Sequence, residues 1–132
     1  MTVAFVLTFS PLAQGGLFSN RIDKARDFAK ANMIDKAVEV LNQEIEENPT
    51  NAEAHYELGS IYLDHGEFGH AEARFKGAVG LDGKYKKRVT QKYMDTGNAM
   101  MKRGKEHEAR RCFDVAASHD EFQKLSNVGE GF

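Results

Sequence analysis

Two histidines and two carboxylates lie close together near the middle of the chain, and all four are common metal-ligand types. His65 and His70 flank Gly66, with Asp64 and Glu67 beside them. Helical ligands stand three or four residues apart on one face, whereas these histidines are five apart with a predicted turn between them. We therefore expect these side chains to lie on the surface, and we predict no metal site.

The one cysteine and a series of spaced glycines also lack the surroundings that chemistry requires. Cys112 precedes Phe113 in a helical pattern, where an unpaired cysteine is usually a small hydrophobe. Gly77, Gly80 and Gly83 are not preceded by the strand that a dinucleotide-binding loop needs. Nucleophile-elbow, zinc-protease and phosphate-loop motifs are absent from the sequence. We predict no catalytic residue and no cofactor, and hence a protein that is not an enzyme.

Four of the five residues from Lys84 to Arg88 are basic, so a contact with phosphate or nucleic acid could form there. The formal net charge of the whole chain is −2, which gives no general attraction to nucleic acid. We expect this segment to be the solvated start of a helix, with long side chains extending over the surface.

Two helical patterns occupy residues 52–85, on either side of Gly66. Each pattern places apolar residues along one side of a 3.6-residue period. The first consists of Ala54, Leu58, Ile61 and Tyr62, and the second of Phe68, Ala71, Phe75, Ala78 and Val79. Gly59 and Ala71 alternate with Tyr62 and Phe75, so that two helices could approach closely while the rings fill neighbouring gaps.

This spacing resembles the tetratricopeptide repeat, a helix–turn–helix unit of about 34 residues. The positions that characterise the family fall on His55, Leu58, Gly59, Tyr62, Ala71, Phe75, Ala78 and Gly83. His55 replaces the usual tryptophan and Gly83 the usual proline. The resemblance implies an all-α, right-handed α-solenoid that binds other proteins.

Two further units of the same kind surround the central one. The preceding unit, at residues 18–51, closes with Pro49, and residues 50–53 read as a capping box for the next helix. The following unit is displaced by four residues, to 90–123, with Gly104 at its turn. We therefore predict a domain at 18–128 with repeats at about 18–51, 52–85 and 90–123. A short helix follows the third repeat, and residues 129–132 form a tail.

Residues 1–17 do not follow the repeat pattern. An apolar run, Ser10-Pro11 and then a small-x-small triplet resemble a secretory signal peptide, but no basic residue precedes the run. The segment is either a signal or a loose arm. If residues 1–15 are a signal peptide, we expect the protein in the periplasm or outside the cell. If they are not, we expect it in the cytoplasm. The membrane would be a partner only if this segment were an uncleaved anchor.

The resemblance also implies a binding surface, because in this family the first helix of each repeat lines a concave groove. Its groove positions fall here on Ile22, Arg26, Tyr56, Ser60, Leu63, Met94, Asn98 and Met101. Such a groove suits an apolar extended peptide or an amphipathic helix of another protein. Alternatively, these side chains could complete the helix packing, or the N-terminal segment could fill the groove.

Chaperone-binding members hold a C-terminal carboxylate with a clamp of lysine, asparagine and arginine residues. The matching positions here are Ile22, Arg26, Glu57, Gln91 and Asp95, none of which fits the clamp. We expect a scaffold or adaptor of another kind, without a nucleic-acid partner. The alternative is a structural module that forms homo-oligomers through the ends of its repeats, and an enzyme accessory subunit also remains open.

Overall fold

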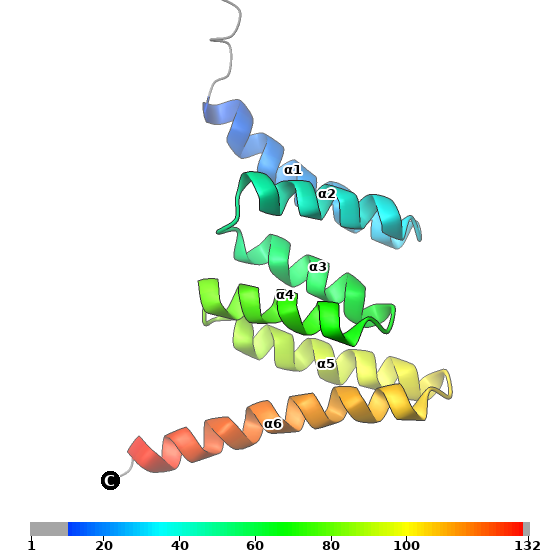
Figure 1. Cartoon of the computed structure of the whole chain (residues 1–132), viewed down its shortest axis with the longest axis vertical. Coiled ribbons are helices and arrows are strands. Elements are labelled where there is room, and N and C mark those ends of the chain that lie inside the picture. Colours follow the sequence, from blue (N-terminus) through cyan, green and yellow to red (C-terminus); the bar gives the residue numbers. More distant parts are fainter. Residues whose placement is uncertain (1–10, 131–132) are drawn as a thin grey trace, which may run out of the picture.

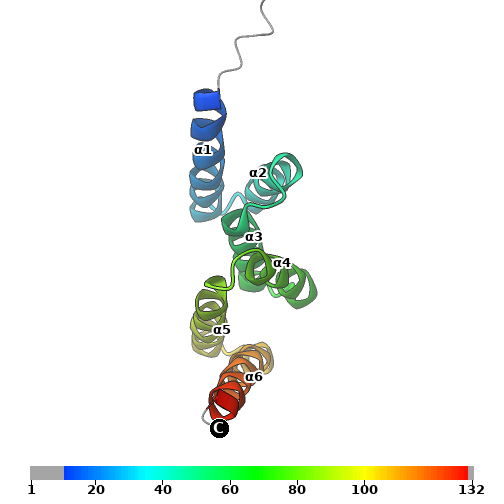
Figure 2. The ribbon, with the colours of Figure 1, turned by 90° about the vertical axis from the view of Figure 1, so that its left-hand side faces the viewer.

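The protein is described by a computed structural model that covers the backbone of residues 11–130 and the side chains of residues 21–119. Its helices are α1 (Pro11–Lys30), α2 (Ile34–Glu47), α3 (Ala52–Asp64), α4 (Phe68–Leu81), α5 (Tyr85–Lys102) and α6 (Glu106–Glu130). Figure 1 shows them stacked in sequence order, and no strand occurs in residues 11–130. In Figure 2, α1 and α5 lie on one side of the stack and α2 and α4 on the other, with α3 between them. This arrangement confirms the predicted all-α solenoid.

The two helices of each pair are joined by the same kind of turn. One residue in each turn has a positive φ angle: Asn32 (59°), Gly66 (76°) and Gly104 (76°). The next amide N–H then donates to the carbonyl five residues earlier, in the bonds Met33 to Phe28, Glu67 to Tyr62 and Lys105 to Met100. This is the closure that ends many helices, and glycine or asparagine adopts it at low cost. The turns expected at Gly66 and Gly104 are therefore present.

Within each pair, a small residue on the first helix faces a large one on the second. A Cβ added to Gly59 would lie 2.8 Å from the Phe75 ring, closer than real side chains approach. At the corresponding places in the first pair, Ala25 replaces the glycine and Leu41, which is smaller than phenylalanine, replaces Phe75; both are fully buried in one cluster. The size of the large residue thus follows the space that the small one leaves. The third pair repeats the glycine–phenylalanine arrangement of the second pair, with Gly97 and Phe113.

The interior consists of two apolar clusters along the stack. The first joins α1 and α2 to one face of α3, and the second joins the end of α3 to α4, α5 and α6. Tyr62, on α3, packs against both clusters. The helix α3 is therefore the element that connects the two halves of the interior.

The start of α3 is fixed by Asn51, whose side-chain oxygen accepts a hydrogen bond of 3.3 Å from the Ala54 amide. The capping box predicted at residues 50–53 is wrong by one residue, because the cap is Asn51 and not Thr50. The carboxylate of Glu53 instead pairs with Arg26 of α1.

A buried carboxylate supports this cap. Glu44 of α2 is fully buried, and its Oε1 accepts a hydrogen bond of 3.0 Å from the Asn51 side chain. Its other oxygen lies 3.4 Å from the guanidinium of Arg21 on α1. Buried carboxylates are stable only when they are paired in this way. Glu44 therefore links α1, α2 and the start of α3.

The helix boundaries differ from the sequence-based expectations at three places. α1 begins at Pro11, inside the segment that was predicted to precede the first repeat, because proline is well suited to the first position of a helix. α5 begins at Tyr85, before the third repeat predicted to begin at residue 90, and the basic segment forms the start of a helix, as predicted. α6 continues without a break to Glu130, so the predicted separate C-terminal helix is part of α6.

The first part of the segment predicted as a signal or loose arm, residues 1–10, lies outside the described residues. Among the described residues, no helix combines the length and hydrophobicity needed to cross a bilayer.

Candidate protein-binding face

The helices α1, α3 and α5 carry all of the predicted groove residues, and α3 packs against both of its neighbours. In Figure 2, α3 is set back between α1 and α5, so the side formed by these three helices curves inward. Three of the predicted residues are buried in this packing. Ile22 lies in the first apolar cluster and Leu63 in the second, and Ser60 is 8% exposed. Their side chains face neighbouring helices, because the helices approach closely at these positions.

Arg26 forms an ionic tie between α1 and α3. Its guanidinium donates hydrogen bonds of 3.1 and 2.7 Å to Glu57, and it also pairs with Glu53 and Asp23. The hydrogen bond to Glu57 is the largest cause that raises the pKa of Arg26 above its usual value. Arg26 is thus a neutralised structural residue at the edge of the face.

The central feature of the face is an aromatic cluster with a stacked arginine. The rings of Tyr56 and Tyr85 lie 5.6 Å apart between their centroids, and Tyr56 also lies 5.8 Å from Phe75. The guanidinium of Arg88 sits over both tyrosines, at 4.3 Å from Tyr56 and 4.8 Å from Tyr85. It forms no ion pair with any carboxylate among the described side chains. The cluster therefore holds an exposed positive charge in a fixed orientation.

Tyr85 and Arg88 were not predicted as site residues, because the basic segment reads as a solvated helix start. The signal was present in the spacing: a tyrosine and an arginine three residues apart share one face of a helix. Their contact with Tyr56, however, joins residues about 30 positions apart and depends on where α5 begins.

One turn beyond Tyr56 on α3, the hydroxyl of Ser60 is buried and has no hydrogen-bond partner among the described residues. A buried hydroxyl without a partner costs roughly 1–3 kcal/mol. A buried water molecule that bonds to this hydroxyl would therefore relieve this cost.

The remaining predicted residues lie on the outer surface of α5. Met94 is 38% exposed, Met101 is 48% exposed, and Asn98 is exposed between them. Their spacing of four and then three residues places them along one face of α5. Together with Tyr56 they offer an adaptable apolar surface, since methionine side chains repack easily.

The groups considered for metal or thiol chemistry do not form a site in the described residues. His65 contacts the Ile61 carbonyl through Nδ1, whereas His70 contacts Glu67. No cluster of three or more metal-ligating side chains occurs among the residues described. Cys112 is fully buried, and burial raises the pKa of its thiol.

Comparison with known proteins gives structural but not sequence relatives. No protein-family model and no curated protein matches the sequence. Among solved structures, the chain is similar to the second TPR of Spaghetti (RPAP3) bound to an HSP90 peptide, SRMEEVD. That match has a TM-score of 0.53 and 23% identity, and covers 78% of this chain and 86% of the other.

The chain is also similar to the crystal structure of MamA, with a TM-score of 0.53 and 20% identity. This match covers 82% of the present chain but only 61% of the other. Both similarities agree with the repeated turns and the small–large helix contacts described above. The described part of the chain therefore has the tetratricopeptide-repeat fold.

Proposed function

We propose that this protein is a non-catalytic scaffold or adaptor that binds a segment of another protein across α1, α3 and α5. The observation that carries the proposal is the cluster of Tyr56, Tyr85 and Arg88. Aromatic rings and a fixed arginine are the residue types that dominate binding energy at protein interfaces.

The chemistry of the face indicates the kind of segment that would bind. Arg88 has Lys84 and Lys87 exposed near it at the start of α5, so an acidic residue of the partner is favoured at this end. Met94 and Met101 would contact apolar side chains of the bound segment. The segment would thus be acidic at one end and apolar at the other.

The RPAP3 structure contains a bound acidic peptide, and it supports the proposal through the shared fold alone. The present chain would use other residues for a similar task. At the edge of the face, Arg26 is already paired with Glu53 and Glu57. The positive charge that remains for a ligand therefore comes from the α5 side, at Arg88.

Selection from a random peptide library against the purified protein tests the proposal, followed by measurement of Kd for the selected peptides. The double variant Tyr56→Ala/Met94→Ala should weaken binding at least tenfold while its circular dichroism stays helical. Met33→Ala is the matched control, because Met33 is 39% exposed in the α1–α2 turn, away from the face. Peptides that bind the double variant as well as the parent protein would contradict the proposed face.

A second candidate is self-assembly through the C-terminal end of the stack. Met101, Glu106, Arg110 and Phe113 line a depression of about 240 Å³ between α5 and α6. No further helix pair covers this end in the described residues. Sedimentation velocity distinguishes the two candidates, because assembly through this end predicts an oligomer that Met101→Glu dissociates. A parent protein that is monomeric at micromolar concentration would remove this candidate.

A further inference from the structure

A hollow of about 280 Å³ lies over the second helix pair, between α3 and α4. Two residues of α3 and four of α4 line it: His55, Tyr62, His70, Ala73, Arg74 and Gly77. None of the residues predicted for the groove is among them, and neither Tyr85 nor Arg88 is. The hollow is therefore separate from the proposed binding face.

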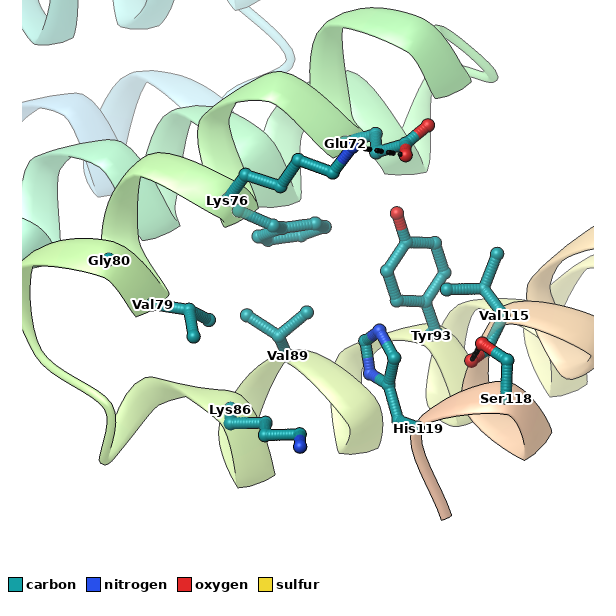
Figure 3. A pocket seen from close by; sticks show the side chains of 11 residues that line it. Glu72, Lys76, Val79, Gly80, Lys86, Val89, Tyr93, Val115, Ser118 and His119 are labelled. Carbon is teal, nitrogen blue, oxygen red and sulfur yellow. Dashed lines mark hydrogen bonds and ion pairs between the residues drawn. The ribbon is translucent and has the colours of Figure 1, made fainter. Parts of the chain in front are cut away.

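The sequence of α4 leaves Arg74 without a carboxylate on its own helix. Side chains three or four residues apart are neighbours on a helix surface. At this spacing from Arg74 the residues carry no negative charge: His70, Ala71, Gly77 and Ala78. By contrast, Lys76 of the same helix pairs with Glu72 at 2.9 Å, beside the hollow between α4, α5 and α6 that Figure 3 shows. Arg74 therefore depends on other elements for a partner.

No other described element supplies that partner. Three arginines are half-buried among the described side chains: Arg21, Arg26 and Arg74. Arg21 pairs with two carboxylates of α2, and Arg26 pairs with one carboxylate of α1 and two of α3. Arg74 forms no hydrogen bond, ion pair or ring contact with any described residue. The planar fork of N–H donors that a guanidinium carries is thus unused at Arg74.

The rest of the lining consists mainly of aromatic rings and adds no negative charge. The ring of His70 packs against Tyr62 at a centroid distance of 5.1 Å, and its Nδ1 lies 2.9 Å from the carboxylate of Glu67, which offsets the charge of His70 when this histidine is protonated. His55 donates from Nε2 to a backbone carbonyl of the α2–α3 loop at 3.1 Å. The lining therefore combines one unpaired positive charge, on Arg74, with three oriented rings.

We propose that this hollow binds a small aromatic carboxylate, whose carboxylate pairs with Arg74 and whose ring packs against Tyr62 and the two histidines. A guanidinium and a carboxylate form two parallel hydrogen bonds, and aromatic rings pack favourably on one another. A single carboxylate balances the single charge of Arg74, whereas a phosphate monoester, with a charge of about −1.5 to −2, leaves an excess. The volume lies just below the usual range of ligand pockets, about 300–1,000 Å³, and so suits a ligand of one ring.

NMR titration with benzoate tests the site, with the ring signals of Tyr62 and the methyl signal of Ala73 as reporters. Because both residues line the hollow, benzoate bound elsewhere on the protein does not contribute to the measured affinity. Both signals should shift to saturation. Benzamide, which has the same shape without the charge, should bind at least threefold more weakly, and phenyl phosphate should bind more weakly than benzoate. Reporter signals that stay fixed, equal binding of benzamide or tighter binding of phenyl phosphate would each overturn the proposal.

A pair of charge variants tests the role of the guanidinium. Arg74→Gln breaks no contact with a described residue, so the protein should fold, and benzoate affinity measured at Tyr62 should fall at least tenfold while benzamide affinity is unchanged. Arg110→Gln is the matched control, because Arg110 is exposed on α6 and lies outside the lining. An Arg74→Gln protein that binds benzoate as tightly as the parent would refute the assignment.

A second pair of variants tests the space. Ala73→Leu places a larger side chain in the lining and should reduce benzoate affinity at least tenfold. Ala117→Leu makes the same change at an exposed position of α6 and should leave the affinity unchanged. Both proteins should remain helical by circular dichroism, because alanine and leucine both favour helices. Equal benzoate affinity in these two variants would place the ligand outside the hollow and contradict the proposal.

Discussion

Replacement of Gly59 by alanine tests the packing that defines each helix pair. The added Cβ would lie 2.8 Å from both Cδ1 and Cε1 of Phe75, and 3.3 Å from the Ala71 carbonyl. The Phe75 ring cannot easily move away, because it is buried and packs against Tyr56 and Tyr93 at centroid distances of 5.8 and 5.4 Å. The substitution therefore forces an overpacked contact.

Two opposing contributions set the magnitude. Alanine is favoured over glycine within a helix by about 1 kcal/mol, whereas overpacking a tight core costs about 1–3 kcal/mol. Gly69→Ala, on the exposed start of α4, receives up to the same helical gain without the clash. We expect Gly59→Ala to be less stable than Gly69→Ala by roughly 1–3 kcal/mol, which corresponds to about 3–10 °C in Tm.

The first repeat supplies the compensating change. It combines alanine at the small position with leucine at the large one, as Ala25 and Leu41. Phe75→Leu alone should cost about 1–2 kcal/mol, less than the removal of the whole ring. In the double variant Gly59→Ala/Phe75→Leu the clash disappears, so a favourable coupling of at least 1 kcal/mol is expected in urea unfolding. Additive effects, or a Gly59→Ala protein as stable as Gly69→Ala, would refute this reasoning.

Three further predictions concern single side chains. Burial raises the pKa of Tyr93 to about 12. As the pH rises, the Tyr93 hydroxyl therefore loses its proton in the unfolded chain before it does so in the folded one, and the free energy of unfolding falls by about 2 kcal/mol between pH 10 and 12. Urea unfolding of Tyr93→Phe should show a shallower decline over this window, and a decline identical to that of the parent would contradict the prediction. Cys112 is buried and its pKa is raised, so Ellman's reagent should react at least a hundredfold faster in urea than with the native protein. Asn51→Ala removes the hydrogen bond that caps α3 at Ala54 and also removes one hydrogen-bond partner of Glu44. The free energy of unfolding should fall by roughly 1–3 kcal/mol. A thermal unfolding curve unchanged from the parent would exclude a capping role for Asn51.

The repeated pairs could be predicted from the sequence because their determinants are local. A small residue on one helix, a large residue on the next and a turn glycine recur at nearly constant spacing, as with Gly59, Phe75 and Gly66. Each of these residues acts within its own pair, so their order along the chain is sufficient. The turn at Asn32 fits the same rule, since asparagine tolerates the positive φ angle.

The binding face was less predictable because it depends on contacts between repeats. Whether Leu63 lies in a groove or in the interior is decided by contacts with later helices, because it is fully buried in the cluster that α4, α5 and α6 complete. Arg88 reaches Tyr56 only because α5 begins earlier than the repeat pattern indicates.

The division of the interior into two clusters determines how the molecule should open to solvent. Because each cluster is built by neighbouring helices only, the α1–α2 pair can open while α4, α5 and α6 keep their contacts. Every such partial opening retains α3 as long as one of the clusters survives, since α3 contributes to both. Amide hydrogens in the middle of α3 should consequently exchange with deuterium more slowly than those of α1 or α2, and the exchange rates should rise toward both ends of the stack.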